Sequence, residues 1–166
     1  KPLAGVLLLA LALPLGQPGW RNGRVIERGA AWIVATPVVV LGIAWAAGAN
    51  RWDPTPVAIF WAWAVLNLLP TCVAGVADFR GLLQGGLVRA ASRIGVPAWS
   101  GIAGAALLFG LGHAAGGPAL VVLSVVAGLG YGLAYAATGR IEAAILAHFA
   151  VNTLHFLVFT YPYPGG

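Results

Sequence analysis

The sequence has 166 residues, of which 60% are hydrophobic and only 8% are charged. A soluble domain carries about a quarter charged residues, so this composition argues against a soluble enzyme, a nucleic-acid-binding domain and a disordered tail. The net charge of +5 comes from cations scattered between apolar runs, which is typical of membrane-protein loops rather than of a stripe that binds nucleic acid. We therefore expect one integral membrane domain over residues 1–166, surrounded by the lipid bilayer and without a nucleic-acid partner.

The apolar runs predict an all-α, polytopic membrane helix bundle of about six to seven transmembrane helices, because one span needs about 20 mostly apolar residues. A break is expected at Pro70, between the third and the fourth helix. The 24 glycines often fall inside the runs, and such small residues let helices pack closely in lipid. In chain order, the predicted helices are 3–15, 30–49, 57–69, 71–91, 98–112, 118–138 and 141–160.

The first run, 3–15, also has the length of a signal-peptide core. Because the rest of the chain is equally apolar, we expect this run to be a first membrane helix, complete or truncated. The chain begins at Lys1 and contains no Met, so we expect it to be a fragment or a processed product. Cys72 is the only cysteine, which excludes an intrachain disulfide and a CxxC metal site.

The basic residues give a prediction of orientation. With seven helices, five of them fall on the side of Lys1 and three on the other side, so the positive-inside rule favours a cytoplasmic Lys1 end. The five are Lys1, Arg51, Arg89, Arg93 and Arg140, and the three are Arg21, Arg24 and Arg28.

The last predicted helix carries a polar stripe. Ionisable side chains within a membrane are costly and usually mark function. At about 100° per residue, His148, Asn152 and His155 fall within about 60° of one another, so two imidazoles and an amide share one face. The alternative to a functional site is a buried stripe whose hydrogen bonds hold helices together.

Two further polar groups are expected at the same depth. His113 ends the fifth predicted helix, where the alternative is an interfacial histidine. Arg80 lies deep in the fourth predicted helix, near Asp78 and Gln84, and needs a partner or a water-filled cavity. The direction of each helix places these groups in the same half of the membrane as Asn152, which predicts one buried polar site.

Three short motifs occur in order: Phe79-Arg80-Gly81, an FxxxH ending at His113, and an HxxxN formed by His148 and Asn152. Together they resemble the CAAX prenyl endopeptidase and bacteriocin-processing (CPBP, or Abi) family of intramembrane proteases. The resemblance covers roughly residues 66–161 and implies a glutamic-type protease core there. It implies that His113 helps to activate a water, that His148 and Asn152 stabilise the oxyanion, and that the arginine is structural.

The first motif departs from the family pattern, EExxxR. Aligned on the arginine, its two glutamates fall on Gly75 and Val76, so the family's catalytic glutamate is missing. Asp78 is the candidate replacement as the base, because it lies three residues after position 75 and about 60° round the helix. Glu142 begins the last predicted helix, where the helix dipole favours it, and it is too far from His113 to serve.

Three functions remain open. The resemblance implies an intramembrane endopeptidase that cleaves membrane-anchored or C-terminally tethered protein segments, with activity impaired by the missing glutamate. The alternative is a catalytically inactive member, a pseudoenzyme, that acts as a membrane binding or regulatory protein. A transporter or structural bundle is the third, although the chain shows no internal repeat of the kind found in transporters.

We expect no cofactor. A zinc site built from His113, His148, His155 and Asp78 is the alternative. Neither HExxH nor another zinc spacing occurs, and no GxSxG occurs for a serine protease.

We expect a multi-pass protein of a prokaryotic inner (cell) membrane. Its site should lie toward the non-cytoplasmic half, which favours exported substrates.

Overall fold

The computed structural model describes residues 23–54 and 57–159, so the predicted helix 3–15 lies outside the described residues. This part of the chain is helical, which confirms the all-α class, and its one strand-like pairing is an isolated bridge between Trp52 and Phe159. The helices are α2 (Gly23–Ala46), α3 (Phe60–Asn67), α4 (Ala74–Val76), α5 (Gly85–Arg93), α6 (Ala98–Leu111), α7 (Gly117–Thr138) and α8 (Ile141–Val158), with 3-10 turns at Val57–Ile59 and Ala114–Gly116.

The helices α3, α4 and α5 belong to one continuous helical rod, Phe60–Arg93, of 34 residues. π-helical turns at Leu68–Val73 and Ala77–Gln84 join its α-helical parts. The break predicted at Pro70 is therefore wrong. Proline has no N–H to donate and its ring crowds the preceding turn, and the wider π-helical turn around Pro70 accommodates both defects without ending the helix.

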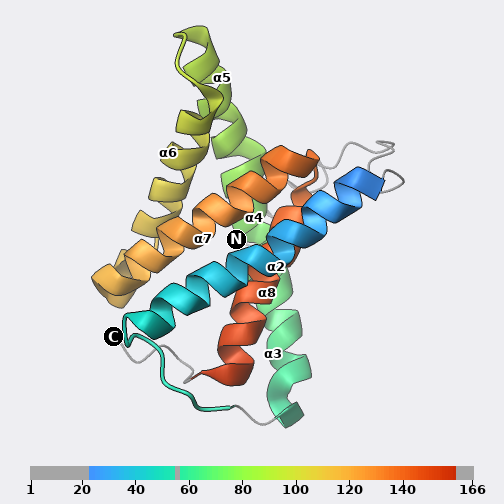
Figure 1. Cartoon of the computed structure of the whole chain (residues 1–166), viewed down its shortest axis with the longest axis vertical. Coiled ribbons are helices and arrows are strands. Elements are labelled where there is room, and N and C mark those ends of the chain that lie inside the picture. Colours follow the sequence, from blue (N-terminus) through green and yellow to red (C-terminus); the bar gives the residue numbers. More distant parts are fainter. Residues whose placement is uncertain (1–22, 55–56, 160–166) are drawn as a thin grey trace.

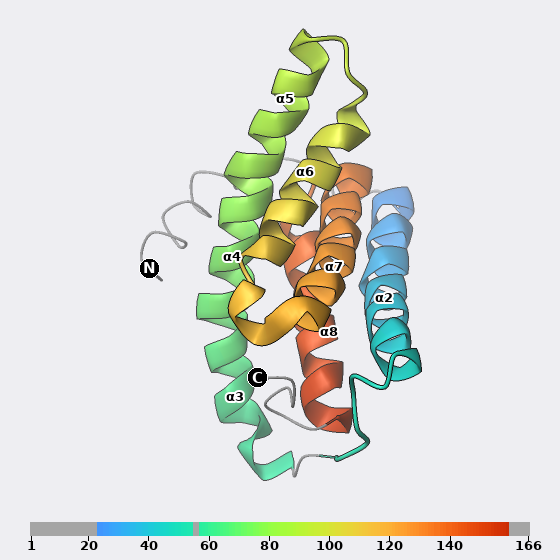
Figure 2. The same ribbon diagram turned by 90° about the vertical axis from the view of Figure 1, so that its left-hand side faces the viewer.

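The rod runs along one side of the molecule, with α6 folded back beside it, so that α5 and α6 form a hairpin projecting beyond the other helices (Figure 2). The helices α2 and α7 lie side by side, and α8 descends from the end of α7 (Figure 1). Helix α7 is central, because it packs against α2, α6 and α8. The end of α8 is tied to the loop after α2, where the Asp53 N–H donates to the Val158 carbonyl oxygen over 3.2 Å.

Glycine allows α6 to approach both of its neighbours closely. A Cβ built on Gly101 would lie 2.6 Å from the backbone nitrogen of Val88 in the rod. A Cβ on Gly110 would lie 2.8 Å from the carbonyl oxygen of Val121 in α7. Because backbone atoms cannot yield, a larger residue at either position would push the helices apart, as expected where small residues mediate packing in lipid.

The expected count of six to seven membrane helices is not confirmed. Helix α6 has 14 residues and is shorter than the ~20 that one span needs. Large apolar side chains such as Trp61 and Ile94 are 74% and 77% exposed, which suits contact with lipid. Within the described residues, four stretches are long and apolar enough to cross a membrane: Gly23–Ala46, Phe60–Arg93, Ala114–Thr138 and Ile141–Val158.

The arrangement gathers basic residues at one end of the bundle. Helices α2 and α7 run in opposite directions, so the start of α2 lies near the end of α7 (Figure 1). The end of the rod lies beside the start of α6, where Gly101 meets Val88. The third and the fourth predicted helix form one rod, so the predicted division of basic residues between the two sides of the membrane is wrong. Among the described basic residues near the ends of the bundle, only Arg51 lies at the opposite end. The end with more positive charge carries Arg24, Arg28, Arg89, Arg93 and Arg140.

Candidate active site

His113 lies two residues after the end of α6. Its backbone N–H donates to the Gly110 carbonyl oxygen over 2.9 Å. Its ring Nδ1 lies 2.8 Å from the Phe109 carbonyl oxygen. A carbonyl oxygen can only accept a hydrogen bond, so Nδ1 carries the proton and Nε2 of the neutral ring is left as an acceptor.

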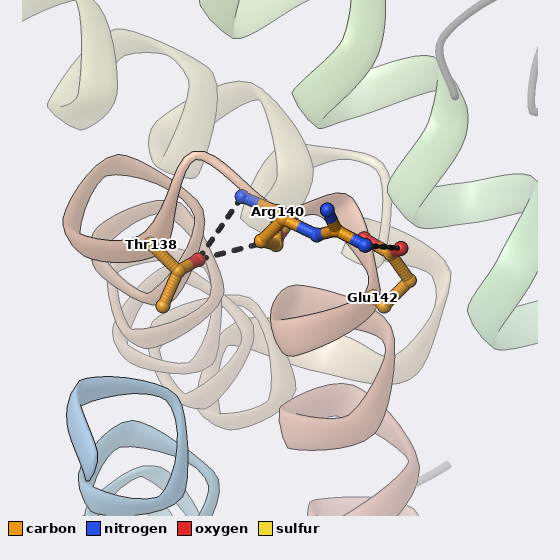
Figure 3. Close-up of polar contacts among 3 residues, drawn as sticks. All are labelled: Thr138, Arg140 and Glu142. Carbon is orange, nitrogen blue, oxygen red and sulfur yellow. Dashed lines mark hydrogen bonds and ion pairs between the residues drawn. The ribbon is translucent and has the colours of Figure 1, made fainter. Parts of the chain in front are cut away.

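The turn between α7 and α8 fixes where α8 begins (Figure 3). Gly139 has a φ of 66°, a left-handed conformation that ends a helix and that glycine adopts without strain. The Arg140 N–H donates to Thr138 Oγ1 over 3.1 Å, and Arg140 Nη2 donates to Glu142 Oε1 over 2.8 Å. Glu142 is thus ion-paired in the first turn of α8, where the helix dipole favours an acid. This turn sets the rotation of α8 and thereby the direction of its polar stripe.

Helix α8 places His148 against two aromatic rings. The imidazole stacks on the Tyr131 ring of α7, with ring centroids 4.7 Å apart. It also meets the Phe109 ring of α6 edge-on, with centroids 5.8 Å apart. The same Phe109 ring lies 4.7 Å from the His113 ring. The FxxxH and HxxxN motifs therefore meet at one phenylalanine.

Arg80 packs against the same two aromatic rings. Its guanidinium carbon lies 5.7 Å from the Phe109 centroid and 6.0 Å from the Tyr131 centroid, within the range of cation–π contacts. Its Nη1 donates to Gln84 Oε1, and Gln84 Nε2 donates to the Gly132 carbonyl oxygen, each over 3.1 Å. Arg80 is 1% exposed, and its Nε and Nη2 have no hydrogen-bond partner. Arg80 and Gln84 thus link the rod to α7.

A second polar group joins the rod to α8. Asn152 Nδ2 donates to Asn67 Oδ1 over 3.1 Å. The Cys72 thiol donates to the same oxygen over 3.2 Å, and the Cys72 sulfur lies 3.7 Å from Asn152 Nδ2. The three side chains form a closed triangle, so the HxxxN asparagine is held from the rod.

These helices line a half-open cavity of about 340 Å³. Its polar wall includes four residues singled out from the sequence, namely His113, His148, Asn152 and His155. Arg80 and Gln84 are buried outside this wall, and Asp78 is exposed and does not line it. Much of the remaining lining is apolar and comes from α2, α7 and α8: Val40, Leu41, Ala44, Leu120, Leu123, Ala127 and Val151.

The sequence analysis did not single out several polar residues of the wall. Asn67 is an amide within an apolar run, the same signal that drew attention to Asn152, and it could have been found in this way. Asn50 lies in the loop after α2, where no periodic pattern marks it, yet it is 7% exposed with both amide atoms unpartnered. The polar residues that sequence reasoning left unassigned are Asn50, Asn67, Thr71 and Ser124.

The histidines do not form a compact cluster of metal ligands. Among residues 23–54 and 57–159, no group of three or more His, Cys, Asp or Glu side chains is arranged to hold a metal ion. The zinc alternative also required Asp78, which lies outside the wall of the cavity.

Apolar helices of membrane-spanning length thus surround a cavity that the FxxxH and HxxxN motifs help to line. Comparison with protein-family models matches residues 56–154 to type II CAAX prenyl endopeptidase Rce1-like proteins. The match covers more than half of the chain and contains all three motifs, so the chain belongs to this family. No curated protein and no solved structure matches the chain.

Proposed function

We propose that the chain is an intramembrane endopeptidase that cleaves membrane-anchored or C-terminally tethered protein segments. The observation that carries this proposal is that His113, His148 and Asn152 line one cavity in a chain of the CAAX-protease family. An apolar lining with a few convergent polar groups is typical of a binding site, and here it suits a peptide with apolar side chains.

The chemistry requires a base for a water and donors for an oxyanion. We assign the water to His113, because the hydrogen bond from its Nδ1 to the Phe109 carbonyl leaves Nε2 to accept a proton. The water oxygen bonds to the scissile carbon while its proton passes to Nε2. That proton then goes to the leaving amine as the C–N bond breaks. His148 and Asn152 stabilise the carbonyl oxygen as it becomes an oxyanion.

Asp78 remains a second hypothesis for the base. Its carboxylate is exposed and does not line the cavity, whereas His113 does. We therefore favour His113 as the group that accepts the proton of the water. A single histidine without the family's glutamate implies a low rate of cleavage.

One observation favours a second candidate function, that of an inactive family member that binds a membrane segment and acts as a regulatory protein. Gly75 and Val76 occupy the positions of the two glutamates, and neither side chain can accept a proton. The same cavity would then hold a protein segment without cleaving it.

We place the protein in a prokaryotic cell membrane with its Arg93 end in the cytoplasm. Helix α8 runs away from that end, so Asn152 and His155 lie in its distal half. The site then lies toward the non-cytoplasmic half of the bilayer. This depth favours exported or surface-anchored substrates over cytosolic ones.

The experiment measures release of a soluble tag from a membrane-tethered reporter protein in proteoliposomes. Wild type should release the tag, with or without a chelator. His113→Ala and Asn152→Ala should each lower release at least about a hundredfold, the usual cost of removing a base or an oxyanion donor. Ser92→Ala is the matched control, because Ser92 is exposed near the end of the rod. A wild type that cross-links to the reporter without releasing the tag would favour the inactive candidate, and one that does neither would overturn both.

A further inference from the structure

The π-helical turn Leu68–Val73 brings together two side chains that a regular helix would separate. In an α-helix, residues five apart lie about 140° apart round the axis, so Asn67 and Cys72 would face different directions. A turn with i→i+5 hydrogen bonding brings such residues onto one face. The Cys72 thiol accordingly donates to Asn67 Oδ1 over 3.2 Å.

The Asn67 amide is oriented by two donors. Its Oδ1 accepts from the Cys72 thiol and, over 3.1 Å, from Asn152 Nδ2. Reversing the Asn67 amide would turn its N–H groups toward the Asn152 nitrogen, which is also a donor. If both amides reversed together, the thiol would be left with only its longer contact, 3.7 Å, to the Asn152 amide. The observed orientation is the one in which each donor has its shorter contact.

This arrangement decides which atoms Asn152 can offer to a ligand. Its amide nitrogen has two hydrogens. One is directed to Asn67 Oδ1, and the other has only the Cys72 sulfur, 3.7 Å from the nitrogen. Sulfur is a weak acceptor, so the second hydrogen is available to a stronger acceptor such as a developing oxyanion.

We propose that Asn67, a residue outside the three motifs, is a positioning residue that holds the Asn152 amide with its nitrogen available for the scissile carbonyl oxygen. This inference rests on the proposed function for its catalytic consequence. Asn67 itself acts through Asn152, and the π-helical turn around Pro70 is the local structure that supports it.

The first test compares two substitutions of Asn67 in the cleavage assay. Asn67→Leu has a similar size but cannot accept a hydrogen bond, whereas Asn67→Asp keeps an oxygen acceptor. We expect Asn67→Leu to lower kcat about tenfold to a hundredfold, as misplacing a catalytic group by about 1 Å can do, with KM changed less than about threefold. Asn67→Asp should retain most of the wild-type kcat, because its oxygen still orients Asn152. A purely structural role would lower only the folded fraction, so kcat expressed per folded molecule would stay at the wild-type value.

The second test does not depend on cleavage. The chain has four asparagines, Asn22, Asn50, Asn67 and Asn152, so ¹⁵N-asparagine labelling gives few side-chain amide signals, and Asn152→Ala assigns the relevant pair. We expect Asn67→Leu to shift the two Asn152 N–H signals toward those of an unbonded amide, and Asn67→Asp to keep them apart. Asn50→Leu is the matched control, because Asn50 lines the same cavity but makes no bond to Asn152.

The outcomes separate the two proposals. Unchanged Asn152 signals in folded Asn67→Leu, or equal shifts in Asn50→Leu, overturn the inference whatever the activity. If no variant cleaves any reporter, the proposed function fails, and the spectra alone decide whether Asn67 orients Asn152. Where Asn67→Leu does not fold, Asn67→Ala gives the same reading, since it also removes the acceptor.

Discussion

The Tyr131 ring stacks on the imidazole of His148, with ring centroids 4.7 Å apart and ring planes 25° apart. Both side chains are buried, and His148 Nδ1 has no hydrogen-bond partner. The plane of this imidazole is therefore set by aromatic packing from α7 and α6 rather than by a hydrogen bond to Nδ1. Tyr131 of α7 thus orients His148, a residue of the HxxxN motif on the neighbouring helix α8.

The first prediction follows from this stacking. Tyr131→Ala should destabilise the protein by about 3–5 kcal/mol, the usual cost of truncating a buried aromatic residue, and should lower cleavage because His148 loses its support. Tyr131→Phe keeps the ring and should retain most of the stability. The buried Cys72 thiol makes the measurement simple, because a thiol-reactive dye labels it only on unfolding. Equal melting temperatures for the two variants would contradict this account.

Much of the fold could be predicted from hydropathy alone. The expected helices 118–138 and 141–160 correspond closely to α7 and α8, because long apolar runs bounded by glycine or charge leave few alternatives. The Pro70 break was wrong, since a π-helical turn offers a local solution that no hydropathy pattern reveals. Helix α2 already includes residues 23–29, before the apolar run, because these turns are polar and hydropathy does not mark them.

The candidate site was predictable only where its spacing is helical. His148 and Asn152 are four residues apart and share a face in any α-helix, and both line the cavity. The partnership of Asn152 with Asn67 joins residues 85 apart and depends on tertiary packing. Asp78 was proposed from its position on a regular helix, but π-helical turns precede and contain it, and its side chain is exposed.

The second prediction concerns close packing of α6. Gly101→Ala should cost about 1–3 kcal/mol, the usual range for overpacking, because its Cβ would lie 2.6 Å from the Val88 backbone nitrogen. Gly42→Ala is the matched control, since nothing lies within 4 Å of a Cβ there, and it should stabilise α2 by about 0.5–1 kcal/mol. Thermal unfolding in detergent, followed by the thiol dye, measures both. A similar loss at the two positions would argue against glycine-mediated packing between α5 and α6.

The third prediction concerns orientation in the membrane. Arginines predominate at the Arg93 end, so the positive-inside rule places that end in the cytoplasm. On a Cys72→Ser background, Ser92→Cys and Asp53→Cys introduce thiols at exposed positions of opposite ends. A membrane-impermeant thiol reagent added to intact cells should label the variant at position 53 and leave the variant at position 92 unlabelled until the membrane is broken. The reverse pattern would show that the bundle has the opposite orientation.

The fourth prediction concerns the missing glutamate. A Cβ built on Gly75 meets nothing within 4 Å, so a longer side chain can be introduced there without a clash at its base. Gly75→Glu should raise cleavage at least about tenfold, because a positioned general base contributes about 10²–10⁴-fold. Gly75→Gln is the matched control, since it has the same shape and cannot accept the proton. Equal rates for the two variants would show that the position does not reach the water.

Asp78→Asn decides between the two candidate bases in the same reporter assay. The amide keeps the shape of the side chain and removes its capacity to accept a proton. Asp78 is exposed and does not line the cavity, so we expect the cleavage rate of Asp78→Asn to lie within about threefold of wild type. His113→Ala should instead lower the rate by about 10²–10⁴-fold, which is the contribution of a general base. Loss of cleavage in Asp78→Asn with rescue by Gly75→Glu would instead identify Asp78 as the base, and would require the rod to turn that carboxylate toward His113. If wild type and Asp78→Asn are both inactive and only Gly75→Glu cleaves, the chain is a family member that has lost its base and kept the rest of the site.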